Sequence, residues 1–215
     1  MVSKPIFISG ENVYALDAFA LPEHYKDSLQ AILIPKGMIK DRIQKMTQEI
    51  HRDYQGKQPT IICILKGAEK LFSDLTHELD VLNSSNPKTS VPFKYDFLRA
   101  SSYANDSSTG FVKLTLTDLE ALHSKDILLV EDIVDTGATL AKIIETLKRH
   151  HPASIKVVSM LVKRTTRSSG FVPDYAGFSI PDLFVVGYCL DYNEHFRDLS
   201  HICIINDHGK DKYRQ

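Results

Sequence analysis

One stretch of the chain places three carboxylates and a small polar turn directly after an apolar run. The run is Ile127 to Val130, the carboxylates belong to Glu131, Asp132 and Asp135, and the turn spans residues 136–139. If the run is a strand and the turn begins a helix, the free N–H groups and the positive helix end form a phosphate site. The carboxylates could accept hydrogen bonds from sugar hydroxyls or take part in proton transfer. The alternative is an ordinary helix N-cap, made by Asp135 or by the residue after it.

The elements around this stretch alternate between helical and strand patterns. Apolar residues at helical spacing predict a helix over 38–54, a second over about 71–79 and a third over about 140–147. Continuous or alternating apolar runs predict strands at 61–65, 91–99, 127–130, 155–162 and 183–186. This order predicts an α/β fold with a mostly parallel sheet. Ligands of such sheets bind beyond the carboxyl ends of the strands, which is where the three carboxylates lie.

A long run of small polar residues from Ala100 to Gly110 interrupts this alternation. Its composition is that of a disordered surface loop. Long loops in compact domains are often functional, so an active-site lid over residues 101–110 is the second interpretation.

Composition excludes several classes of protein. The chain has 215 residues, with 26 Lys and Arg against 27 Asp and Glu and a formal net charge of −1. This balance does not favour binding nucleic acid through bulk positive charge. With 43% hydrophobic residues, the chain is not a disordered acidic one either. Its length suits one large domain or two small ones.

The cysteines and the N-terminus predict a cytoplasmic protein. Cys63, Cys189 and Cys203 each lie alone in an apolar run, which is typical of reduced thiols in a protein core. No apolar run reaches the ~18 residues that a membrane span needs. The first residues lack the apolar stretch of a signal peptide. We therefore expect no membrane association.

The stretch from Val130 to Thr139 resembles the phosphoribosyl-pyrophosphate (PRPP) binding motif of type I phosphoribosyltransferases. Further segments are similar to the purine-specific members of that family, in the same order, and the likeness covers the chain from about residue 13 onward. These segments are Ile34-Pro35-Lys36-Gly37, Leu65-Lys66-Gly67, Ser102-Tyr103, Leu161-Val162-Lys163-Arg164-Thr165, Phe184-Val185-Val186-Gly187-Tyr188-Cys189-Leu190-Asp191-Tyr192-Asn193-Glu194 and Phe196-Arg197-Asp198-Leu199.

The resemblance implies a fold and an activity. The fold would be a single domain over residues 1–215, with a central five-stranded parallel sheet flanked by helices and a small hood built from the two chain ends. The activity would be purine salvage by pentosyl transfer from PRPP to hypoxanthine or guanine, which gives IMP or GMP and pyrophosphate. Mg²⁺ would be the cofactor, and the family forms homodimers and homotetramers.

The resemblance also assigns the residues that would bind PRPP. The turn would hold the 5′-phosphate through Thr136, Gly137, Ala138 and Thr139. Glu131 and Asp132 would accept hydrogen bonds from the ribose hydroxyls. They would also bind the magnesium ion, with Asp191 as the third ligand. Lys66 and Gly67 would form the pyrophosphate loop, and Arg197 would clamp pyrophosphate. Taken singly, Lys66 is more typical of a solvated residue at a strand end, and Arg197 is more typical of a surface ion pair.

On the purine side, Asp135 would be the catalytic residue, beside the ring nitrogen that attacks the sugar. Lys163 would select 6-oxopurines, because an ammonium group can only donate a hydrogen bond and therefore opposes the 6-amino group of adenine. Phe184 would stack on the purine, and Val185 would contact its edge through the backbone, with Asp191 close by. Ser102 and Tyr103 would belong to the lid. By composition alone, Phe184 would be a core residue and Lys163 a solvated one.

Three positions depart from the family pattern. Ala68 stands where a second Gly is frequent, Ala138 where many relatives have Lys, and Ser101 where Lys is common in animal enzymes. These departures leave open a catalytically weak nucleotide-binding paralogue with a regulatory role. A second alternative is an RNA-binding regulator on the same fold, which would need a local basic face.

Overall fold

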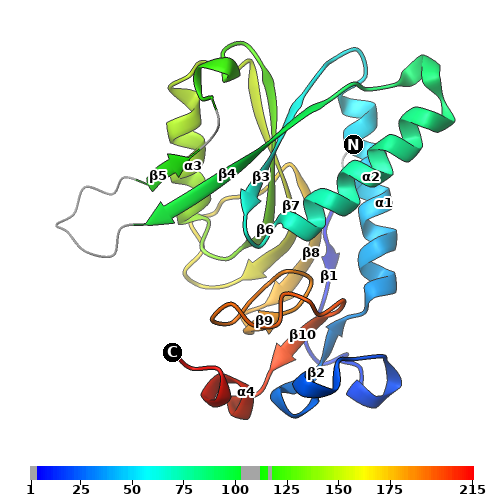
Figure 1. Ribbon diagram of the computed structural model, residues 1–215, viewed down its shortest axis with the longest axis vertical. Helices are drawn as coiled ribbons and strands as arrows, with labels where there is room; N and C mark the ends of the chain where they lie inside the picture. The colour runs from blue at the N-terminus through cyan, green and yellow to red at the C-terminus, as the bar shows by residue number, and fades with distance from the viewer. Residues whose placement is uncertain (1–3, 103–111, 116–117) are drawn as a thin grey trace.

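The computed structural model describes residues 4–102, 112–115 and 118–215. Its main sheet has seven strands in the order β1-β8-β7-β6-β3-β4-β5 (Figure 1). All neighbours pair in parallel except β4 and β5. The strands are β1 Ile6–Phe7, β3 Thr60–Leu65, β4 Lys94–Ser102, β5 Val112–Thr115, β6 Asp126–Val134, β7 Ser154–Arg164 and β8 Tyr175–Pro181.

The parallel part of this sheet has six strands, where the sequence predicted five. Two of the six were missed for physical reasons. The two residues of β1 are too few to show a period, and β8 contains Gly177, Ser179 and Pro181, which break its apolar pattern. The α/β class and the parallel arrangement are as predicted.

A second, three-stranded sheet forms the hood. Its order is β2-β10-β9, with β2 at Leu29–Ile34, β10 at Ile202–Ile205 and β9 at Val185–Val186, and both pairings are antiparallel. The strand predicted at 183–186 therefore belongs to the hood rather than to the main sheet. Segments from both ends of the chain meet here, as the resemblance implied (Figure 1).

Helices cover both faces of the main sheet. Figure 1 shows α1 and α2 on one face and α3 on the other. The helices are α1 Lys36–Asp53, α2 Glu69–Ser85, α3 Ala138–Lys148 and the C-terminal α4 Asp207–Lys212, with 3₁₀ turns at Leu16–Ala18, Glu23–Ser28, Pro87–Thr89 and Glu120–Leu122. Among the described residues, no helix combines the length and apolarity needed to cross a bilayer.

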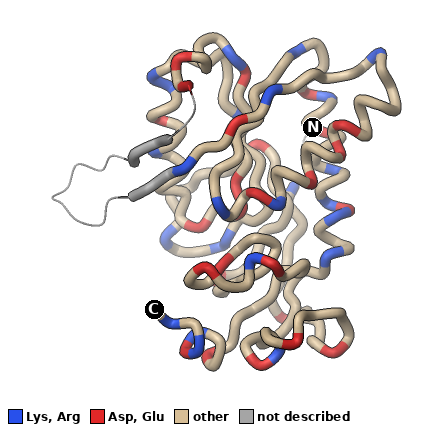
Figure 2. Tube along the Cα trace, viewed as in Figure 1, with Lys and Arg blue, Asp and Glu red and all other residues tan. Residues whose placement is uncertain are grey.

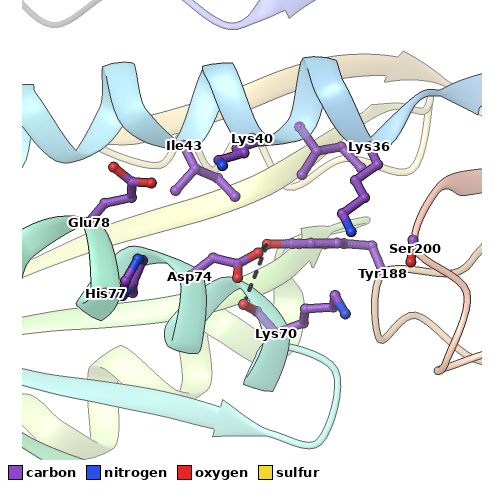
Figure 3. Close-up of a pocket in the computed structure, with 10 residues that line it drawn as sticks. Lys36, Lys40, Ile43, Lys70, Asp74, His77, Glu78, Tyr188 and Ser200 are labelled. Carbon is purple, nitrogen blue, oxygen red and sulfur yellow. Dashed lines mark hydrogen bonds between the residues drawn. The ribbon is translucent and has the colours of Figure 1, made fainter. Parts of the chain in front are cut away.

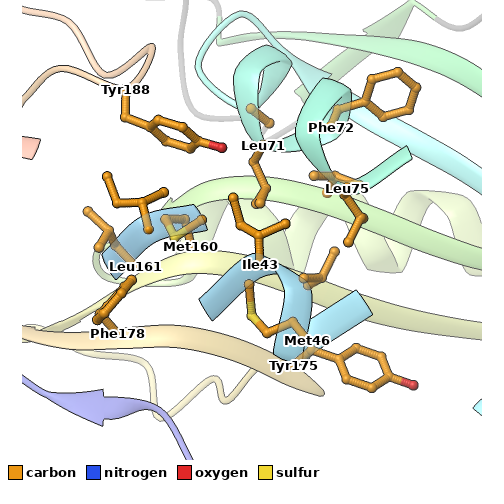
Figure 4. Close-up of a cluster of buried hydrophobic side chains, with 14 of the residues drawn as sticks. Ile43, Met46, Leu71, Phe72, Leu75, Met160, Leu161, Tyr175, Phe178 and Tyr188 are labelled. Atoms are coloured by element: carbon orange, nitrogen blue, oxygen red, sulfur yellow. The ribbon is translucent and has the colours of Figure 1, made fainter. Parts of the chain in front are cut away.

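The core has one layer on each face of the sheet. Along β3, Ile61 and Cys63 pack with α1 and α2 while Ile62 and Ile64 pack with α3, so the strand is buried on both faces as predicted. Figure 4 shows the first layer, where Ile43 and Met46 of α1 approach Leu71 and Leu75 of α2. All three cysteines are buried and free. Burial raises the pKa of the Cys63 and Cys203 thiols to about 12, which keeps them protonated.

Candidate active site

Two adjoining pockets lie beyond the carboxyl end of β6. The larger, of about 190 Å³, is lined by Asp132, Ile133, Asp135, Lys163, Phe184, Val185, Leu190 and Asp191. The smaller, of about 100 Å³, is lined by Glu131, Ile133, Val134, Asp135, Thr136, Gly137, Thr139 and Leu140. Asp135 therefore borders both pockets, which places one carboxylate between the two halves of the site.

The turn at the smaller pocket is built around Gly137. This residue has φ +80°, and a Cβ there would lie 2.7 Å from Ser169 Oγ and 2.9 Å from Phe171 Cβ. Gly137 is also the N-cap residue of α3, and it has no side chain with which to cap the helix. The Thr136 hydroxyl accepts a 3.3 Å hydrogen bond from the Ala138 N–H. The N-cap residue is therefore neither Asp135 nor Thr136, although the Thr136 hydroxyl does cap the first N–H of the helix. The positive end of α3 lies beside the pocket.

Glu131 and Asp132 follow the continuously buried run Ile127 to Val130 of β6 and lie close together. The pKa of Glu131 is raised well above its ordinary value, first by burial and then by the neighbouring Asp132 carboxylate. A Cβ on Gly67 would lie only 1.6 Å from Asp132 Oδ2. The loop after β3 therefore touches this carboxylate through a position that only glycine can occupy.

A chain of ion pairs runs from that loop to the hood. Lys66 Nζ lies 2.7 Å from Glu194 Oε2, and Arg197 Nη2 lies 3.2 Å from Glu194 Oε1 and 2.9 Å from Asp191 Oδ1. Arg197 also donates a 2.8 Å hydrogen bond to the carbonyl of Cys189. Glu194 therefore contacts both of the cationic side chains that were predicted to bind pyrophosphate, Lys66 and Arg197. Hydrogen bonds from these two side chains lower the pKa of Glu194.

A second group of ion pairs links two residues of the larger pocket, Lys163 and Asp135, to neighbours outside its lining. Lys163 Nζ lies 3.3 Å from Asp135 Oδ2 and 3.8 Å from Asp182 Oδ1. Arg167 Nη2 lies 3.7 Å from Asp135 Oδ1 and 3.8 Å from Asp182 Oδ1. The Lys163 side chain is only 10% exposed, so the interpretation as a solvated residue is wrong. Arg167 and Asp182 were not predicted as site residues, because Arg167 stands in a polar segment, Asp182 stands alone between Pro181 and Leu183, and neither belongs to a motif.

The hood segment supplies the opposite wall of the larger pocket. Phe184 is 47% exposed, which contradicts its interpretation as a core residue. Its ring meets that of Tyr192 edge to face, with centroids 5.4 Å apart. Val185 is buried in β9, and it lines the pocket beside Phe184. Of the two predicted lid residues, Ser102 ends β4, while Tyr103 lies outside the described residues, as does most of the 101–110 segment.

Comparison with known proteins decides the family. The model of the phosphoribosyl transferase domain matches residues 34–193. The chain belongs to this family. It is 46% identical to the hypoxanthine-guanine phosphoribosyltransferase of Rattus norvegicus over 99% of this chain and 98% of the relative. It is 48% identical to phosphoribosyltransferase domain-containing protein 1 of Homo sapiens, over 94% of this chain and 89% of that protein.

A solved structure agrees with the fold of this phosphoribosyltransferase. The hypoxanthine-guanine phosphoribosyltransferase of Schistosoma mansoni in complex with IMP superposes with a TM-score of 0.83 at 35% identity. The match covers 98% of this chain and 100% of the other. The type I phosphoribosyltransferase fold implied by the sequence is therefore confirmed.

The carboxylates of this phosphoribosyltransferase divide between the two pockets. Asp132 and Asp191 line the larger pocket, and Glu131 lines the smaller one. Within the described part of the chain, no three His, Cys, Asp or Glu side chains group closely enough to hold a metal ion. Two carboxylates at one pocket are a donor set that fits Mg²⁺, which keeps most of its water and takes further ligands from substrate phosphates.

Proposed function

We propose that this chain is a purine-salvage enzyme, a hypoxanthine-guanine phosphoribosyltransferase. It transfers the 5-phosphoribosyl group of PRPP to hypoxanthine or guanine and releases IMP or GMP with pyrophosphate. The observation that carries this proposal is the pair of pockets that share Asp135, one beside a helix end and one beside Lys163. Close relatives carrying that enzyme's name support it over nearly the whole chain.

The smaller pocket binds the 5′-phosphate. The backbone N–H groups of Gly137 and Thr139 and the hydroxyls of Thr136 and Thr139 supply the donors, and the positive end of α3 favours the dianion. Ala138 is exposed and does not line the pocket, so it contributes backbone only. Glu131 and Asp132, at the end of β6, accept hydrogen bonds from the ribose hydroxyls.

Pyrophosphate leaves between the Lys66 and Gly67 loop and the hood. Arg197 and Lys66 both form ion pairs with Glu194, and both can exchange that carboxylate for the diphosphate when PRPP binds. Asp132 and Asp191, together with the substrate, would hold magnesium, which would supply positive charge beside the leaving group. The lid, with Ser102 and Tyr103, excludes water from the reactive sugar.

The larger pocket binds the purine. Phe184 stacks on the ring, the Val185 backbone contacts its edge, and the Lys163 ammonium donates to the 6-oxo group. The ring nitrogen attacks the anomeric carbon as the bond to pyrophosphate breaks, and Asp135 accepts the proton that the ring gives up. Its place between the pockets suits this role, because the new bond joins the two substrates there.

We also propose that residues 1–215 form a single domain, that the enzyme works in the cytoplasm, and that it assembles as a homodimer or homotetramer. Acidic and basic residues are interspersed along the described trace in Figure 2, and this distribution does not favour the RNA-binding alternative. All the side chains assigned a chemical role are present, which does not favour the catalytically weak alternative.

The test is to incubate the protein with PRPP and magnesium and with each of hypoxanthine, guanine, xanthine and adenine. We expect nucleotide and pyrophosphate to form with hypoxanthine and guanine and not with adenine. Binding of IMP without turnover would instead favour the regulatory paralogue. Retention on RNA that weakens with salt would favour the RNA-binding alternative.

A further inference from the structure

A separate pocket of about 260 Å³ lies between α1 and α2 (Figure 3). None of its lining residues borders either pocket of the active site. The lining comes from three parts of the chain: Lys36, Ile39, Lys40 and Ile43 of α1, Lys70, Asp74, His77 and Glu78 of α2, and Tyr188 and Ser200 of the hood. This pocket has no part in the proposed reaction.

Three lysines give the pocket its chemistry. Lys36 and Lys40 reach it from α1, and Lys70 reaches it from α2 (Figure 3). None of the ion pairs among the described residues involves these three ammonium groups, although other lysines of the chain do form such pairs. Three ammonium groups around one cavity, each with three donors and no acceptor, leave a site that favours an anion.

The two carboxylates at the pocket are already hydrogen-bonded. Asp74 Oδ2 accepts a 2.6 Å hydrogen bond from the Tyr188 hydroxyl, and Glu78 Oε1 accepts a 3.2 Å hydrogen bond from Gln44. In Figure 3, Glu78 lies at the opposite end of the pocket from Lys36, Lys70 and Ser200. Only Glu78 is bonded outside the pocket, whereas Asp74 is bonded to Tyr188, which is itself a lining residue. Lys70 Nζ lies 5.9 Å from the centroid of the Tyr188 ring and has no carboxylate partner among the ion pairs of the described residues. Three ammonium groups against two carboxylates leave the pocket with an excess of positive charge.

The size and floor of the pocket limit what can bind there. Ile39, Ile43 and Tyr188 are all buried, so the floor is apolar and rigid. The volume lies below the roughly 300–1,000 Å³ of pockets that enclose drug-sized ligands. A small anion with a short organic body fits this combination better than a complete nucleotide does.

We propose that the pocket between α1 and α2 is a second anion site, which binds a small phosphate-bearing ligand, either inorganic phosphate or a short-chain phosphate monoester. Lys36, Lys40 and Lys70 supply the charge, the Ser200 hydroxyl supplies a neutral donor, and the Tyr188 ring packs against the ligand body. Because Lys70 lies in the first turn of α2, the ligand binds close to the loop of Lys66 and Gly67 that precedes this helix.

Equilibrium dialysis of the full chain against radiolabelled inorganic phosphate tests this site. The active site also binds phosphates, so the measurement is made with and without saturating IMP and compared with Lys36→Gln/Lys40→Gln, which removes two charges outside the proposed active site. We expect the wild type to bind one more phosphate per chain than this variant under both conditions, or to bind it at least about tenfold more tightly.

Lys45→Gln is the matched control, because Lys45 lies on the same helix but pairs with Glu49 at 3.7 Å. It should bind phosphate like the wild type. Turnover with hypoxanthine shows that each variant is folded, and Lys40→Gln alone replaces the double variant if that one fails to fold. Glycerol 3-phosphate as competitor then separates the two ligands: tighter binding than phosphate identifies a monoester site, and weaker binding a site for the free ion. Equal phosphate binding by wild type and variant overturns the proposal.

Discussion

The two halves of the active site are built in different ways. On the phosphate side, backbone makes the closest approaches: Gly137 turns with φ +80°, and the loop at Gly67 touches the Asp132 carboxylate. On the purine side, charged side chains fill the same role, with Lys163 and Arg167 each within 3.8 Å of two carboxylates. The backbone contacts of the first half are set once the chain folds, whereas a ligand can rearrange the ion pairs of the second half and those of Lys66 and Arg197 with Glu194.

This difference predicts two patterns of mutational damage. A side chain added at Gly67 or Gly137 must displace its neighbours, because other atoms already lie within contact distance of the position that its Cβ would take. A side chain removed from the ionic half leaves the framework intact and changes the charge that the substrate meets. Asp135 belongs to both halves, so its replacement is the most severe test of the comparison.

Asp135→Asn should have the largest effect on turnover. The amide cannot accept the proton of the purine, and positioned proton transfer contributes roughly 10²–10⁴-fold to rate. We expect kcat to fall within that range while the dissociation constant for IMP changes by much less. Steady-state assays and nucleotide titration measure the two quantities.

Asp182→Asn is the matched control for that experiment. Asp182 lies 3.8 Å from Lys163, as part of the same group of ion pairs, but does not line either pocket of the site. It should keep most of the turnover. Equal losses in the two variants would show that Asp135 acts only through the charge of the group and not as a proton acceptor.

Gly67→Ala should produce the next largest effect. The new Cβ would lie 1.6 Å from Asp132 Oδ2, so either the loop or the carboxylate must move. Misplacement of about 1 Å can cost roughly 10²-fold in rate, and we expect a loss of that order in kcat/KM for PRPP. Gly37→Ala is the control, because a Cβ at that helical position meets nothing within 4 Å. Full activity of Gly67→Ala would show that the phosphate half does not depend on a close backbone approach at this position.

Lys163→Gln should alter selectivity more than rate. An unpaired buried donor costs about 1–3 kcal/mol, so the preference for hypoxanthine over adenine in kcat/KM should fall by about tenfold or more. Arg167→Gln, which removes the neighbouring charge from Asp135, should leave that preference nearly unchanged. If discrimination against adenine survives in Lys163→Gln, another group selects the 6-oxo function.

The backbone half was largely predictable from the sequence, and the ionic half was predictable only in part. Gly67 and Gly137 lie in contiguous motifs, so a short stretch of letters identifies both the turn and the helix that follows. Arg167 and Asp182 meet Lys163 through tertiary structure, and each alone is typical of a surface charge. For the same reason the pairing of Glu194 with Lys66, which spans most of the chain, has no local sequence signal.

The smallest expected effect concerns the hood, which borders the purine half of the site but not the phosphate half. Phe184 and Val185 of the hood line the purine pocket, whereas the phosphate turn joins β6 to α3 and contains no hood residue. His201, just before β10, anchors the hood to the start of α1, because its Nδ1 accepts a 3.0 Å hydrogen bond from the Lys36 N–H. Burial lowers the pKa of this histidine, so the folded protein favours the neutral ring.

Protonation should therefore weaken the hood in mild acid. The unfolded histidine titrates near pH 6.5, so below that value the unfolded chain binds more protons than the folded one, and stability falls as the pH falls. We expect a modest decrease of Tm between about pH 7 and pH 5 that is smaller in His201→Gln. The exposed His123→Asn serves as the control and should follow the wild-type pH dependence. An identical pH dependence in His201→Gln would show that protonation of this histidine does not weaken the hood.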